Sequence, residues 1–185
     1  MKSTKLAGRY AKALFDYAQQ QDKIEQVNSD LILVKNVIKE NRELKFIIES
    51  PIIFPDKKNN IFSNIFDGKI CDLTFGFLSL IIIKKREPAL TAICDEFLAL
   101  YNDYHNIKIV QVITASPLSP TLIEEIKRRM EKKTSATILI QEKTDPNIIG
   151  GVVIKYDDYL FDASIISRIN QLRSEFSQNM YRAAF

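Results

Sequence analysis

The sequence is poor in the residues on which several protein classes depend. Its 185 residues include two cysteines, five glycines, one histidine and no tryptophan. Two cysteines cannot build the disulfide framework of small secreted domains, and with one histidine they match no recognised zinc spacing. The few glycines form neither a Walker nor a dinucleotide-binding loop. We therefore expect no metal site and no cofactor.

Long apolar runs and a strong net charge are also missing. The longest apolar run, Leu78 to Ile83 with Ser79 inside it, is far shorter than the roughly 20 residues of a membrane-spanning helix. We therefore expect no membrane span. The formal net charge of +3 is too small to demand nucleic acid, while the 46% hydrophobic content suffices for a folded core.

The first part of the chain, up to about residue 106, has helical periodicity and no strand signal. Asp56 is expected to be the N-cap of one helix, and Pro88 to stand in the first turn of the last one. Cys71 and Cys94 lie in apolar helical patterns, where a free cysteine is usually a small buried side chain. We predict about six helices, namely an N-terminal helix through Ala18, then Ile24–Ile38, Leu44–Glu49, Asp56–Phe66, Asp72–Lys85 and Glu87–Tyr101.

After Asn106 the period changes from helical to alternating. The β-branched run 107–114 predicts a strand, and a helix then opens at Ser119-Pro120 with Leu122, Ile126 and Met130 inward. Further strands are predicted at 137–141, 149–155 and 159–161, the last two joined by a hairpin at Asp157-Asp158. A final helix carries the apolar stripe Ile165, Ile169, Leu172, Phe176 and Met180. The fold class is thus α+β: an N-terminal six-helix bundle, 1–105, followed by a small α/β domain, 106–185, with a mixed sheet and two helices.

Catalytic chemistry finds little support in these residues. His105 stands alone where a helix passes into a strand. A single imidazole could act as a general base, but a histidine in interdomain packing or in solvent is favoured. The acidic pairs Glu124-Glu125 and Asp157-Asp158 are explained by a helix dipole and a turn. Gly150-Gly151 favours a turn or bulge over close approach of a phosphate. We therefore expect a protein that is not an enzyme.

Two helices have more apolar surface than one core face requires. The first helix has two adjacent stripes, and the segment from Leu73 to Ile83 is apolar nearly all round. One interpretation is that both helices are central in the bundle. The other is that they lie side by side and expose a hydrophobic groove for a partner helix.

A basic cluster, Lys127-Arg128-Arg129 with Lys132-Lys133, gives the alternative function of a nucleic-acid-binding adaptor. No aromatic residue is interleaved with these cations to stack on bases. The cluster is also what a helix carries near its C-terminus as counter-charge to its dipole. The solvated helix face is therefore favoured, and no nucleic-acid partner is expected. An enzyme of unknown type is a third possibility.

Three stretches together resemble one family. They are Arg9–Phe15, Phe77–Leu80 continuing through Lys85-Arg86 to Phe97, and Asp145–Ile154 with Asp162-Ala163-Ser164. These stretches are similar to the delta subunit of F-type ATP synthases, which is called OSCP in mitochondria. The resemblance covers essentially the whole chain, and its last stretch is the most specific.

The resemblance implies a non-catalytic stator that couples proton transport to ATP synthesis. In such a subunit the N-terminal bundle holds the N-terminal helix of an ATP synthase alpha subunit in a groove between its first and fifth helices. The C-terminal domain binds the b subunits of the peripheral stalk. By position, Tyr10, Ala13, Phe77 and Leu80 would line the groove, and periodicity adds Leu6, Tyr17 and Leu73. We expect a peripheral protein on the cytoplasmic face of the bacterial inner membrane.

The change of period at Asn106 predicts a domain boundary, so residues 1–105 should fold without the rest of the chain. The expressed fragment is expected to show a helical circular dichroism spectrum and one cooperative thermal transition. A fragment with little helical signal, or with a gradual melt, would contradict the division.

Overall fold

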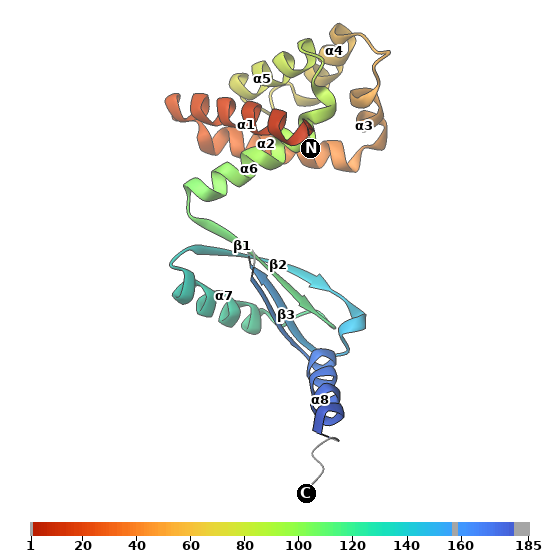
Figure 1. Cartoon of the computed structure of the whole chain (residues 1–185). Coiled ribbons are helices and arrows are strands. Elements are labelled where there is room, and N and C mark those ends of the chain that lie inside the picture. The colour runs from red at the N-terminus through yellow and green to blue at the C-terminus, as the bar shows by residue number, and fades with distance from the viewer. Residues whose placement is uncertain (1, 157–158, 180–185) are drawn as a thin grey trace, which may run out of the picture. The chain divides into compact units, whose positions relative to one another are not determined.

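The computed structural model describes residues 2–156 and 159–179, with side chains for 5–132, 134–156 and 159–176. The fold class is α+β, as predicted. Within the described residues there are eight α-helices, two short 3-10 helices and one four-stranded mixed sheet. The chain divides into two compact units, Met1–His105 and Asn106–Phe185 (Figure 1).

The first unit is entirely helical over its described residues. Its core is formed mainly where α1 packs along α6 and where α2 contacts both α6 and α5. Phe15, Phe62, Phe66 and Phe97 are the bulkiest aromatic members of this core. Its elements are α1 (Lys2–Gln20), α2 (Ile24–Glu40), α3 (Arg42–Glu49), α4 (Pro55–Phe66), α5 (Asp72–Ile83), η1 (Glu87–Ala89) and α6 (Leu90–Tyr104).

Three local predictions for this unit were wrong. Asp56 is not an N-cap, because α4 begins one residue earlier at Pro55 and its N-cap position is Phe54. Cys71 is the half-buried N-cap of α5, where Asp30 accepts a hydrogen bond from its backbone N–H at 2.9 Å. Pro88 lies in the separate 3-10 turn η1. Cys94 is fully buried as predicted, and burial raises the pKa of its thiol to about 12.

A buried ion pair joins three segments of the first unit. Lys58 of α4 is 1% exposed, and its Nζ lies 2.5 Å from Glu87 Oε1. The same Nζ donates a 2.8 Å hydrogen bond to the carbonyl of Ile48 near the end of α3. An unpaired charge at this depth would be strongly destabilising, so the three groups hold one another in place. The second carboxylate oxygen of Glu87, Oε2, is buried and has no hydrogen-bond partner among the described residues.

The second unit is built on a sheet with strand order β2-β1-β3-β4. Strand β1 runs parallel to β2, with α7 as the crossover between them, and antiparallel to β3. The core against α7 is small, centred on Val110, Val112 and Ile138. The elements are β1 (Ile107–Thr114), α7 (Pro120–Thr134), β2 (Thr137–Thr144), η2 (Pro146–Ile148), β3 (Gly151–Tyr156), β4 (Tyr159–Ser164) and α8 (Ile165–Asn179).

The glycine pair marks a sharp entry into β3, in keeping with the predicted conformational role. Gly151 has φ +84°, and a Cβ there would lie 2.3 Å from the carbonyl oxygen of Ala163 on β4. Only glycine fits such an approach of two backbones. The turn at Asp157-Asp158 lies outside the described residues, but β3 and β4 pair antiparallel from Tyr156 and Tyr159 onward.

The buried pair predicts a non-additive stability effect. Glu87→Gln leaves the Lys58 ammonium without a countercharge and should cost about 3–5 kcal/mol of unfolding free energy. Lys58→Met combined with Glu87→Leu removes both charges and should be markedly more stable than Glu87→Gln alone, because no buried charge remains. Urea unfolding of the three proteins measures this. Equal losses in the single and double variants would contradict a charge-based role for the pair.

Candidate partner-binding surfaces

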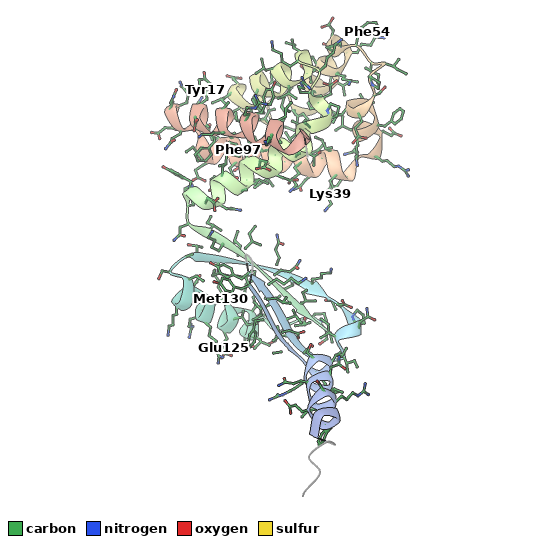
Figure 2. All side chains as sticks on the ribbon, in the orientation of Figure 1. Tyr17, Lys39, Phe54, Phe97, Glu125 and Met130 are labelled. Atoms are coloured by element: carbon green, nitrogen blue, oxygen red, sulfur yellow. The ribbon has the colours of Figure 1, made fainter. Side chains whose placement is uncertain are left out.

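The two apolar stripes of α1 have different environments. Ala7, Ala11, Leu14 and Ala18 are buried in the core, with three of the four at 0% exposure. The neighbouring stripe is not buried in the same way: Leu6 and Tyr10 are half-buried, Ala13 is exposed, and Tyr17 is 52% exposed. Figure 2 shows Tyr17 projecting outward from the C-terminal part of α1, whereas Phe97 of α6 lies inside the unit. The second stripe therefore forms the outer face of α1.

Helix α5 repeats this division. Thr74, Leu78, Ile81 and Ile82 are buried. Leu73 and Phe77 are half-buried and Leu80 is 44% exposed, and these three recur at helical spacing. The same apolar helix thus supplies core on one side and accessible apolar surface on the other. Of the seven predicted groove residues, three are exposed, namely Ala13, Tyr17 and Leu80. The other four are half-buried, and Tyr10, Leu73 and Phe77 among them pack against the core.

The two outer faces run antiparallel. The N-terminal half of α1 lies beside the segment that follows α5, because Leu6 and Arg9 line the same cavity as Arg86 and Pro88. The end of α1 then lies toward the start of α5 (Figure 1). Helix α1 packs mainly along α6, and α5 packs mainly along α4. The helices α1 and α5 pack less closely against each other.

The second unit has an apolar cavity between α7 and the sheet. Its volume is about 940 Å³. On the helix side Met130 and Ile126 line it, and Figure 2 labels Met130 together with Glu125 on the same helix. On the sheet side Leu160 and Phe161 of β4 are 62% and 63% exposed. The sequence predicted β4 as a strand but not as a surface, although three consecutive bulky residues, Tyr159–Phe161, already imply that one must face outward.

The final helix has an uncovered apolar face. Ile165, Ile169, Leu172 and Phe176 recur at helical spacing as predicted, yet each is at least 41% exposed. Met180, the last predicted member, lies outside the described residues. Asp162 fixes the start of α8, accepting hydrogen bonds from the Ser164 N–H at 2.8 Å and the Ser167 hydroxyl at 2.6 Å. These bonds lower the pKa of the Asp162 carboxyl, with the Ser167 hydroxyl the largest cause.

The basic cluster on α7 is partly neutralised within its own helix. Arg129 lies 2.6 Å from Glu125, and Lys127 lies 3.9 Å from Glu131, each pair four residues apart. Such pairs are typical of a solvated helix face. Nothing in this arrangement favours the nucleic-acid interpretation.

Titratable groups do not assemble into a catalytic constellation among the described residues. His105 contacts Glu25 at 3.2 Å and packs against Tyr101. Tyr101 donates a 2.6 Å hydrogen bond to the same carboxylate, which raises the pKa of its phenol to about 12 and makes it a poor acid. No nucleophile completes this group, and no cluster of potential metal ligands is found in the described part of the chain. No helix in that part is long and apolar enough to span a bilayer.

Comparison with known proteins decides the family. A family model described as the ATP synthase delta (OSCP) subunit matches residues 6–176. The chain belongs to this family. A protein of Cytophaga hutchinsonii named ATP synthase subunit delta is 37% identical over 97% of this chain and 98% of its own length. Its counterpart in Rickettsia bellii is also 37% identical, covering 90% and 89%.

The fold has a solved relative as well. A chain in the cryo-EM structure of the Toxoplasma gondii mitochondrial ATP synthase hexamer matches with a TM-score of 0.75 at 22% identity, over 92% of this chain and 97% of that one. The family consists of non-catalytic stator subunits of F-type ATP synthases. This chain is such a subunit.

The outer face of α1 can be separated from its inner face by one pair of substitutions. Ala13→Asp adds a carboxylate to exposed surface and should change the unfolding free energy by no more than about 0.5 kcal/mol. Ala11→Asp, two residues away, buries the same unpaired carboxylate and should cost on the order of 4 kcal/mol or prevent folding. Thermal and urea unfolding of the full chain give both values. A similar loss of unfolding free energy in both variants would mean that Ala13 is part of the core.

Proposed function

We propose that the outer faces of α1 and α5 together bind the N-terminal helix of an ATP synthase alpha subunit, with the second unit binding the b subunits of the peripheral stalk. The seven residues of the first surface are named here the α1–α5 groove: Leu6, Tyr10, Ala13, Tyr17, Leu73, Phe77 and Leu80. The observation that carries the proposal is the accessible apolar stripe on each of two antiparallel helices.

The size and spacing of the groove suit a helix as its occupant. Leu6 to Tyr17 spans about 16 Å, or roughly three turns, at the rise of an α-helix. A partner helix with apolar residues at i, i+3, i+4 and i+7 presents one stripe over the same length. Ala13 lies in the middle of the α1 stripe, where its small side chain leaves room for a bulky residue of the partner. Tyr10 and Phe77, both half-buried, supply the aromatic walls.

The second unit offers two accessible apolar surfaces for the stalk. One is the cavity between α7 and β4, and the other is the uncovered stripe of α8. Apolar surface of this extent on a small domain marks an interaction site. Helical ends of b subunits would bury both, since each surface is lined by aliphatic and aromatic side chains.

Binding partners on separate units gives the chain the mechanical role of a stator. Torque from the rotor acts on the catalytic head, and the head stays still only if it is tied to the static membrane sector. Each unit has its own core, so one can hold the head while the other holds the stalk. Because the relatives above include bacterial proteins, we place this link on the cytoplasmic face of the bacterial inner membrane, as a peripheral protein.

Two variants and two ligands test the assignment. Ala13→Asp puts a carboxylate in the α1–α5 groove, where binding would desolvate it without a partner. We expect affinity for a synthetic alpha-subunit N-terminal peptide to fall by about 100-fold or more, with b-subunit binding unchanged. Leu160→Glu changes an exposed residue of the second unit. It should weaken b-subunit binding and leave binding of the alpha-subunit peptide unchanged. Isothermal titration calorimetry with the full-length chain gives all four constants.

Each variant is the control for the other, since both add one negative charge on exposed surface. A wild-type chain that binds neither ligand would refute the proposal. Loss of both ligands in one variant would mean that the surfaces are not separate.

A further inference from the structure

A cavity lined by cations adjoins one end of the α1–α5 groove, since Leu6 belongs to both. The cavity has a volume of about 530 Å³, and its lining includes Lys5 and Arg9 of α1 and Lys85 and Arg86 of the α5–η1 connection. All four side chains are exposed. None of them forms an ion pair with another described residue, and no acidic residue lines the cavity. Four uncompensated cations around one hollow attract a negatively charged group.

The α5–η1 connection has a fixed backbone. The Arg86 N–H donates to the carbonyl of Ile81 and the Lys85 N–H to that of Ile82, the two bonds of a Schellman helix end. Lys85 takes the left-handed conformation, φ 54°, at the position where glycine is usual. Lys85 and Arg86 therefore project from a hydrogen-bonded turn, and Lys5 and Arg9 project from helix α1.

The same connection turns its only acid away from the cavity. Glu87 follows Arg86 directly, but its carboxylate is buried against Lys58 and cannot neutralise the cations outside. At the opposite end of the groove the exposed charges are mixed. Asp16 lies two turns beyond Arg9 on α1 and Asp72 stands in the first turn of α5, but Lys23 follows α1 and Lys69 precedes α5. The groove thus has one positive end, at the cavity, and one end of mixed charge.

We propose that the cavity lined by Lys5, Arg9, Lys85 and Arg86 holds acidic side chains at one end of the partner helix and so fixes the direction in which that helix lies. This inference rests on the proposed function of the groove. Apolar contacts along a stripe tolerate a reversed helix, whereas a concentration of positive charge at one end of the groove favours one direction. The occupant is therefore an amphipathic helix with acidic residues at the end that meets Arg9 and Arg86.

The test compares two charge reversals in the full-length chain. Arg9→Glu with Arg86→Glu lowers the net charge at the cavity by four. Lys39→Glu with Lys57→Glu makes the same change on exposed residues of α2 and α4, and Figure 2 shows Lys39 on α2. The probe is the synthetic alpha-subunit N-terminal peptide, titrated at several salt concentrations. A second peptide carries Gln or Asn in place of its Glu and Asp residues.

We expect the cavity variant to bind the peptide about tenfold or more weakly at low salt and to lose most of the salt dependence seen with wild type. The control variant should stay within about twofold. The neutral peptide should bind wild type as weakly as the cavity variant binds the acidic one. Circular dichroism melts of both variants should match wild type, because all four residues are exposed.

The inference fails if wild type binds both peptides equally well, or if the two charge reversals have equal effects. It fails also if only free phosphate or anionic lipid vesicles, and not the acidic peptide, lose affinity for the cavity variant. In those cases Ala13→Asp would still abolish peptide binding if the groove is correct. A peptide that wild type does not bind at all would instead refute the proposed function.

Discussion

The arrangement of the first unit depends on one buried cation. A buried lysine such as Lys58 is strongly destabilising unless its ammonium group has partners. Both partners come from outside its own helix: they are the Ile48 carbonyl and the Glu87 carboxylate. A buried pair of this kind adds little net stability, but it permits few alternative arrangements of the segments it joins. By drawing Glu87 inward, it also separates the charges of the α5–η1 connection, acid to the interior and Lys85 and Arg86 to the surface.

The outer faces of α1 and α5 stay accessible because the inner faces of these helices supply most of the core. Three alanines on α1 let it approach α6 closely, so the core takes only part of the neighbouring stripe: Tyr10 packs against it, while Ala13 and Tyr17 stay exposed. Apolar groups such as Leu80 and Ile83, 44% and 61% exposed, are then left in contact with water. Burying them against a partner recovers the hydrophobic free energy that folding did not use, which is how a small domain can bind without a polar active site.

The second unit also buries only part of its apolar surface, and its core is smaller. Three buried residues form the centre of the core between the sheet and α7. Leu160, Phe161 and the α8 stripe lie outside this core and are exposed. Glycine at position 151 and the Asp162 hydrogen bonds set where β4 ends and α8 begins. The apolar surfaces of β4 and α8 are therefore joined through a hydrogen-bonded junction of strand and helix.

Periodicity in the sequence determined the element types, the change from helices to strands at Asn106, and the existence of two stripes on α1. It did so because backbone geometry repeats every 3.6 or 2 residues regardless of what the chain packs against. The tertiary structure alone decided which stripe is buried, since the two stripes of α1 are similarly apolar and only contact with α6 distinguishes them. Nor could periodicity find the cationic cavity. Arg9 and Arg86 are 77 positions apart in the numbering, and only the antiparallel course of α1 and α5 brings them to the same hollow.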